Sequence, residues 1–180
     1  MLVAKDKIKS NIGEYLLYMF QIEDLLRACN FIKTIIETNL VAQYKTDETT
    51  TNEIRDWYFG LSDLMQEEKL ETKGHLSFII NKINEVYDFH LYLLQHADFA
   101  EYQLKFKEIT IVLNDIKSKQ KKALNDVEII INTIYGIYLL KLKKQEISAE
   151  TIKSASILSK FMAELSNHFK EYESGELKLE

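Results

Sequence analysis

The chain has 180 residues, of which 46% are hydrophobic and 28% are charged, and its formal net charge is −5. This composition excludes a disordered or collagen-like chain, fits one globular domain, and lacks the basic surplus typical of nucleic-acid-binding proteins. Proline is absent and only 5 glycines occur, which argues against an all-β fold with many tight turns. Long helices with few connections remain.

Apolar side chains recur at helical spacing and predict a single-domain, all-α bundle of about seven helices. The expected helices cover residues 5–29, 31–44, 48–70, 75–95, 98–118, 125–144 and 148–172. Several of them are expected to begin at side chains that cap helix N-termini, namely Asp47 (or Thr46), Asp98, Asn125 (or Asp126) and Ser148. The domain then spans residues 5–172, and the acidic tail at 173–180 is expected to fray.

The N-terminal segment becomes charged at Lys5 and has no apolar core of a signal peptide. The richest apolar stretch, 129–140, is about twelve residues long, which is too short to cross a bilayer. The single cysteine, Cys29, excludes an internal disulfide and suits a reducing compartment. We therefore expect a cytoplasmic protein with neither a membrane nor a nucleic-acid partner.

Several short phrases occur together and in order along the chain. They are EYLLYM at 14–19 followed by QIEDL at 21–25, IRDWY at 54–58, KGHL at 73–76, IYG at 134–136 and KQEIS at 144–148. Together they resemble a family of small, all-helical, uncharacterised Bacteroidetes proteins described only as a domain of unknown function. The resemblance covers nearly the whole chain and implies an all-α fold and a cytosolic bacterial protein. It implies no activity, so it assigns no functional residue here.

Glu23 lies within the apolar face of the first predicted helix, between the directions of Ile12 and Leu16. A buried carboxylate is costly unless it is paired or hydrogen-bonded. Arg27 follows four residues later, which is the favourable spacing for a helical ion pair. Two interpretations remain. Either Glu23 and Arg27 neutralise one another at the edge of the core, or Glu23 binds a metal, a ligand amine or a partner residue.

His90 points along the middle of the apolar face of the helix at 75–95. It is either a neutral core histidine bonded to a carbonyl or a tyrosine, or the best general acid or base in the chain. The other histidines have ordinary explanations: His75 in a turn or cap after Gly74, His96 at a helix end, and His168 in a solvated charge cluster.

No motif for a catalytic or metal centre occurs in the sequence. The Glu-x-x-His pairs of a di-iron bundle, the ligand sets of zinc sites, the nucleophile elbow, the P-loop and the dinucleotide-binding glycines are all missing. We therefore predict no metal and no cofactor, and we favour a protein that is not an enzyme.

Gly13, Gly60 and Gly136 lie inside predicted helices, where each costs about 1 kcal/mol relative to alanine. Close approach of another helix is the expected reason, and a ligand against bare backbone is the alternative. Aromatic side chains near these glycines are expected to line a pocket, a dimer interface or an ordinary core; they are Tyr15, Tyr18, Trp57, Tyr58, Tyr135 and Tyr138.

The sequence leaves two functions open. The first is a non-enzymatic, cytosolic interaction or scaffold protein that acts as a homo-oligomer through one helix face. The second is a helical protein that binds a small molecule or a metal, and this alternative includes an enzyme. Its candidate pocket contains Glu23, Arg27 and His90, together with Tyr18, Trp57, Tyr58 and Tyr135.

Overall fold

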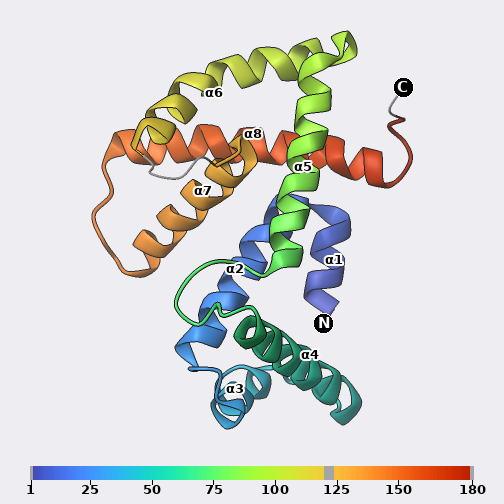
Figure 1. Cartoon of the computed structure of the whole chain (residues 1–180), viewed down its shortest axis with the longest axis vertical. Helices are drawn as coiled ribbons and strands as arrows, with labels where there is room; N and C mark the ends of the chain where they lie inside the picture. Colours follow the sequence, from blue (N-terminus) through green and yellow to red (C-terminus); the bar gives the residue numbers. More distant parts are fainter. Residues whose placement is uncertain (1, 120–123, 179–180) are drawn as a thin grey trace.

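A computed structural model describes residues 2–119 and 124–178, and within these ranges all regular secondary structure is helical. The α-helices are α1 (Leu2–Ser10), α2 (Ile12–Ala28), α3 (Lys33–Asn39), α4 (Glu48–Glu67), α5 (Ser77–Gln95), α6 (Ala100–Lys119), α7 (Asp126–Leu142) and α8 (Ala149–Glu173) (Figure 1). Two 3₁₀ turns, η1 (Val41–Gln43) and η2 (Ala97–Phe99), precede α4 and α6. The all-α prediction is confirmed, with more helices than expected.

Side-chain caps begin most of the long helices. Asp47, Asn125 and Ser148 each accept a hydrogen bond from a backbone N–H three residues later, at 3.0, 2.7 and 3.1 Å. These caps satisfy N–H groups that the first helical turn leaves unpaired. The expected cap at Asp98 is wrong, because this residue lies within η2, before α6 begins.

The helix expected over residues 5–29 is divided at Asn11. This residue has extended backbone angles, and its side chain accepts from the N–H of Glu14 at 3.0 Å, so it caps a new helix. The chain therefore turns between α1 and α2. Ile8 on α1 is 37% exposed, whereas Ile12 at the start of α2 is buried.

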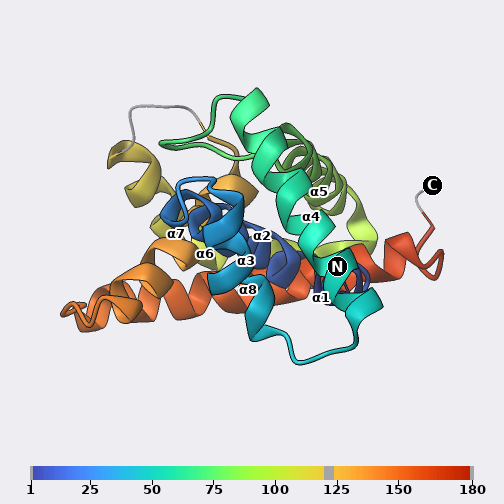
Figure 2. The same cartoon turned by 90° about the horizontal axis from the view of Figure 1, so that it is seen from below.

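Helices α2 and α8 lie at the centre of the helix packing. Helix α8 packs against α1, α2, α5, α6 and α7, and α2 packs in addition against α1, α4, α5 and α7. In Figure 1, α6 lies at one end of the long axis and α3 and α4 lie at the other. Seen from below in Figure 2, α8 spans the width of the molecule on one side, with α4 and α5 on the other.

The apolar stretch of α7 is explained by this packing. Ile129, Ile130 and Ile131 are all fully buried, because α7 contacts α2, α5, α6 and α8 and so has apolar neighbours on several sides. No helix in the described part of the chain is long and apolar enough to cross a membrane.

The last described residues close off α8. Gly175 has φ +77°, and the N–H of Leu177 donates to the carbonyl of Glu171 at 2.9 Å. Leu177 packs against the edge of the core. Fraying of the tail remains a prediction, and residues 179–180 lie outside the described ranges.

Gly13 lies where α2 packs closely against α8. Its N–H donates to Ser166 Oγ at 3.1 Å, and a Cβ there would lie 3.0 Å from both Ser166 Oγ and Met162 Cγ. Close helix packing therefore explains Gly13, as expected. It does not explain Gly60 or Gly136, because a Cβ at either position would meet nothing within 4 Å.

We predict opposite effects for two glycine-to-alanine variants. Gly13→Ala should destabilise the protein by about 1–2 kcal/mol, because Ser166 Oγ is held by hydrogen bonds and cannot retreat. Gly136→Ala should stabilise it by about 0.5–1 kcal/mol, because helix propensity improves without a clash. Urea unfolding of both variants measures this, and equal shifts in the same direction would contradict it.

Candidate functional site

The connection between α4 and α5 turns back on itself at two residues with left-handed backbone angles. Lys69 has φ +57° just after α4, and Gly74 has φ +94°, a value that glycine adopts without strain. These turns direct the carbonyls of Leu70 and Gly74 and the backbone N–H of Leu76 towards α2, where polar side chains receive them.

Glu23 on α2 is fully buried, and both of its carboxylate oxygens are bonded to this connection. Oε1 accepts from the backbone N–H of Leu76 at 2.8 Å, and Oε2 accepts from His75 Nδ1 at 2.5 Å. The His75 ring stacks on Phe20 with centroids 3.6 Å apart, which fixes its plane. The buried charge is therefore compensated within the protein.

Arg27 bonds the same connection at two further points. Its Nε donates to the carbonyl of Leu70 at 3.0 Å, one Nη donates to the carbonyl of Gly74, and the other pairs with Asp24 at 2.8 Å. The first interpretation of Glu23, an ion pair with Arg27, is therefore wrong. Asp24, three residues before Arg27, takes that role instead, and Glu23 pairs with a residue far along the chain.

Tyr135 on α7 joins this arrangement through Asp24. Its hydroxyl donates to Asp24 Oδ2 at 2.6 Å and lies 3.2 Å from the carbonyl oxygen of Phe20. Burial, and next the hydrogen bond to Asp24, raise the pKa of Tyr135, so its hydroxyl remains a donor at neutral pH. We call Glu23, Asp24, Arg27, His75 and Tyr135 the α2 polar network.

The α2 polar network contains a carboxylate that orients an imidazole, as many acid–base sites do. His75 is also 24% exposed. No member of the network, however, lines any of the five cavities described for this structure. Among the described residues, no group of three or more His, Cys, Asp or Glu side chains could hold a metal ion. The contacts that the network does make join α2 to α7 and to the α4–α5 connection.

His90 lies about 20 Å further along α5 than the start of that helix, at about 1.5 Å per residue. It is fully buried, and its Nδ1 lies 2.6 Å from the hydroxyl of Tyr102. Rings of Tyr87, Phe106 and Phe161 surround it. This is the neutral core histidine of the first interpretation. The structure does not bring it together with Glu23 and Arg27.

The second ring nitrogen of His90 has no hydrogen-bond partner among the described residues. His90 Nε2 lies 4.0 Å from Asp126 Oδ2, and Asp126 Oδ1 pairs with Lys117 at 2.6 Å. Burial lowers the pKa of His90 to about 4, against a smaller opposing effect of Asp126. Because the Asp126 carboxylate faces Nε2, we infer that the neutral ring carries its proton there and that Nδ1 accepts from the Tyr102 hydroxyl.

The remaining aromatic candidates form a separate cluster beside α4. Tyr58 and Tyr44 have hydroxyls 3.1 Å apart, and Trp57 contacts Tyr58 edge-on. Burial and the hydroxyl of Tyr44 raise the pKa of Tyr18, so Tyr18 belongs to the same cluster. The structure therefore separates the candidate pocket into three places: the α2 polar network, His90, and these tyrosines.

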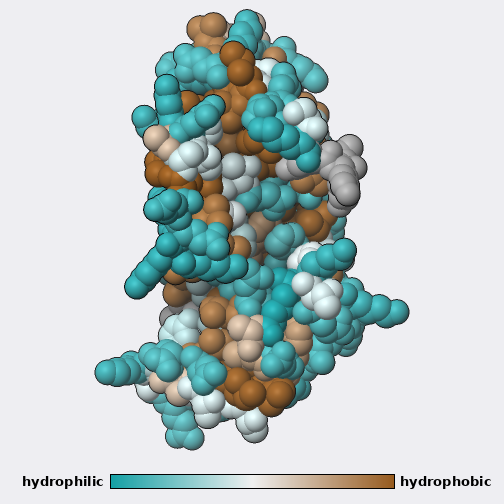
Figure 3. Space-filling view, turned by 90° about the vertical axis from the view of Figure 1, so that its left-hand side faces the viewer, coloured by the Kyte–Doolittle hydropathy of each residue, from teal (hydrophilic) through white to brown (hydrophobic). Residues whose placement is uncertain are grey.

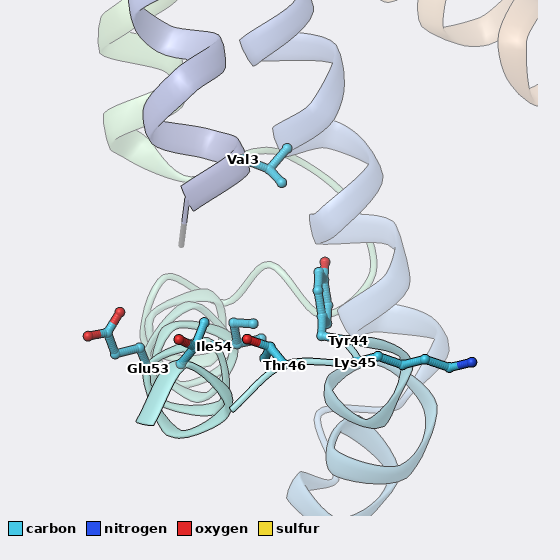
Figure 4. Close-up of a pocket in the computed structure, with 7 residues that line it drawn as sticks. Val3, Tyr44, Lys45, Thr46, Glu53 and Ile54 are labelled. Carbon is cyan, nitrogen blue, oxygen red and sulfur yellow. The ribbon is translucent and has the colours of Figure 1, made fainter. Parts of the chain in front are cut away.

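Tyr44 also lines a small cavity between α1 and the start of α4. The cavity has a volume of about 190 Å³ and is lined by Val3, Tyr44, Lys45, Thr46, Thr50, Glu53 and Ile54. Figure 4 shows Lys45 extending away from it. A cavity of about 150 Å³ holds a molecule the size of benzene, so this one is too small for a nucleotide or a flavin.

Sequence reasoning missed two members of the α2 polar network. Asp24 stands three residues before Arg27, a spacing at which helical side chains also meet. His75 follows a glycine, which indicated the turn but not its partner.

A family model for a domain of unknown function (DUF4924) matches residues 1–176 of the sequence. The chain belongs to this family. The searches of curated proteins and of solved structures found no match. Membership of DUF4924 confirms the resemblance as far as it concerns the family, and it assigns no role to any residue.

We predict that His75→Ala destabilises the protein by about 2–3 kcal/mol, because it leaves the buried Glu23 carboxylate without one of its two hydrogen-bond donors. His168→Ala is the matched control, since that histidine is similarly exposed and pairs with an exposed glutamate. The His168→Ala change should lower the free energy of unfolding by less than about 1 kcal/mol. Denaturant unfolding compares the two, and equal losses would show that the pairing with Glu23 contributes little.

We predict that His90 makes the fold sensitive to acid. Its pKa is about 4 in the folded chain against an ordinary 6.5, so between these values the unfolded state binds a proton that the folded state excludes. Stability should fall by about 3 kcal/mol as the pH drops through this window. His90→Gln keeps an acceptor for the Tyr102 hydroxyl and removes the titratable group. The free energy of unfolding of this variant should therefore fall by about 3 kcal/mol less over the same pH range. Parallel curves for the two proteins would contradict this.

Proposed function

We propose that the protein is a non-enzymatic interaction protein that associates with a second copy of itself through the outer face of α6. The supporting observation is a pair of exposed apolar side chains on that helix. Ile111 is 80% exposed and Leu104 is 61% exposed. They stand about two turns apart on one face. Helix α6 lies at one end of the molecule (Figure 1), and apolar side chains are visible at the same end in Figure 3.

Charge on α6 favours one arrangement of the two copies. Lys107 and Glu108 flank the line from Leu104 to Ile111 on opposite sides, and both are exposed. A two-fold axis parallel to α6 places each apolar side chain against its own copy, and it places Lys107 of each protomer on the same side as Glu108 of the other. An antiparallel pair would instead bring like charges together.

The expected interface is small. One helix face per protomer lies at the low end of the range for specific complexes, so the dimer should form at micromolar concentrations or above. Neither Lys107 nor Glu108 has an ion pair within residues 2–119 and 124–178, so the pairing would not disrupt an existing one.

The alternative function, a ligand or metal site around Glu23, Arg27 and His90, has less support. These residues lie in separate places, and both carboxylate oxygens of Glu23 are already bonded. The sequence has a single cysteine and hence no internal disulfide, which supports a location in a reducing cytosol. We also propose a bacterial origin, within Bacteroidetes, from the sequence phrases that carry the family resemblance.

We predict that Ile111→Glu weakens self-association at least about tenfold, because it places two carboxylates at the centre of the interface. Ile152→Glu is the control, since Ile152 is exposed at the start of α8. Sedimentation equilibrium gives the dissociation constants. The proposal fails if the unmodified protein is monomeric at about 100 µM, or if both variants weaken association equally.

A charge swap on α6 tests the arrangement itself. Lys107→Glu should weaken the dimer, and adding Glu108→Lys should restore it, because the exchanged charges again face each other across the two-fold axis. A double variant weaker than the single variant would exclude this arrangement.

A further inference from the structure

A groove of about 490 Å³ lies between α5 and the C-terminal part of α8, at a site separate from the proposed dimer face. It is lined by Asn81, Asn84, Glu85, Asp88, Phe89, Tyr92 and Tyr172. This volume falls within the range of ligand sites. The groove combines aromatic rings with carboxylates, and among the described residues no lysine, arginine or histidine lines it.

The aromatic wall of the groove is held in place from beneath. Phe89 is buried and stacks on Tyr172, with centroids 5.1 Å apart and planes inclined by 20°. Phe169 meets the Phe89 ring edge-on at 5.5 Å. Tyr92 stacks on His96 at 3.7 Å. The rings are therefore positioned by packing before any ligand arrives.

The charge of the groove is negative. Glu85 and Asp88 both come from α5, about one turn apart. Glu85 pairs with Lys82 at 2.5 Å, and the Lys82 ammonium lies 5.8 Å from the Phe169 ring centroid. Asp88 is exposed and has no ion pair among the described residues. One carboxylate beside the aromatic wall is therefore available to a cation.

We propose that this groove binds the alkylammonium group of a small organic cation, with its carbons against the rings of Tyr172 and Tyr92 and its charge facing Asp88. Aromatic faces attract such cations through the ring quadrupole, and a carboxylate adds direct charge attraction. A neutral molecule of the same shape gains neither term. The groove therefore selects for charge.

Choline and 3,3-dimethylbutanol, its uncharged isostere, provide the test. Titration of the full-length protein followed by NMR should give a dissociation constant near the millimolar range for choline and one at least about tenfold weaker for the isostere. Equal affinities, or no binding of choline at about 50 mM, would overturn the proposal.

Two charge-neutralising variants locate the site. Asp88→Asn should weaken choline binding about fivefold or more. Asp56→Asn makes the same charge change on an exposed residue of α4 and should leave binding unchanged. Equal losses for both would show attraction to net charge alone and would overturn the assignment to this groove.

Tyr172→Leu tests the aromatic contribution. It should weaken choline binding at least about fivefold while leaving the weak affinity for the isostere nearly unchanged, because only the cation uses the ring face. Equal weakening of both ligands would mean that the ring acts through shape alone and would overturn the cation–ring contact.

A lysine side chain of a protein partner carries the same ammonium chemistry. Nα-acetyl-lysine methylamide, titrated in parallel, distinguishes this source. If this lysine analogue binds more weakly than choline, the result supports a free small molecule as the ligand of the groove. Tighter binding would overturn that choice of source.

Discussion

Burial of the Glu23 carboxylate requires hydrogen bonds that α2 does not itself supply. The backbone of a helix has no N–H to offer a side chain in its middle, so the donors must come from another segment. They come from His75 and the N–H of Leu76, and the α4–α5 connection has to lie against α2 to provide them. Because this connection sets where α4 ends and α5 begins, the position of both helices depends on one buried charge.

Arg27 and Asp24 extend the same constraint. Arg27 holds the carbonyls of Leu70 and Gly74, and Asp24 accepts from Tyr135 on α7. The polar residues of a single helix face thereby determine how α2 lies relative to α7 and to the α4–α5 connection. A buried apolar contact is non-directional, whereas these hydrogen bonds tolerate only small shifts. The network consequently specifies position more strictly than the surrounding apolar packing does.

His90 shows the opposite way of burying a polar side chain. It remains neutral, satisfies one ring nitrogen with Tyr102 and leaves the other without a hydrogen bond. The Asp126–Lys117 ion pair lies beside it but too far away to complete the bond. A neutral imidazole tolerates such an environment at neutral pH, while a carboxylate would not.

Local features of this fold were predictable, and long-range ones were not. The caps at Asp47, Asn125 and Ser148 depend on residues within one turn, so the sequence alone places them to within one residue. The apolar faces likewise indicated that Glu23 and His90 would be buried.

Helical spacing offered only Arg27 as a partner for Glu23. The actual partner lies 52 residues away, in a turn whose direction depends on tertiary packing. The break at Asn11 was missed because apolar periodicity continues almost unchanged through it, although asparagine is itself a common cap. The separation of His90 from Glu23 was equally inaccessible, because periodicity gives a face but not the neighbouring helix.

The contact between Gly13 and Ser166 has a consequence for how the chain is made. These residues are 153 positions apart, so α2 leaves the ribosome long before its neighbour α8 has been translated. Domains generally acquire their tertiary packing as units during synthesis. Until then the part of α2 that faces α8, around Gly13, stays uncovered, even though α1 and α4 precede α8 in the chain and cover other parts of this helix.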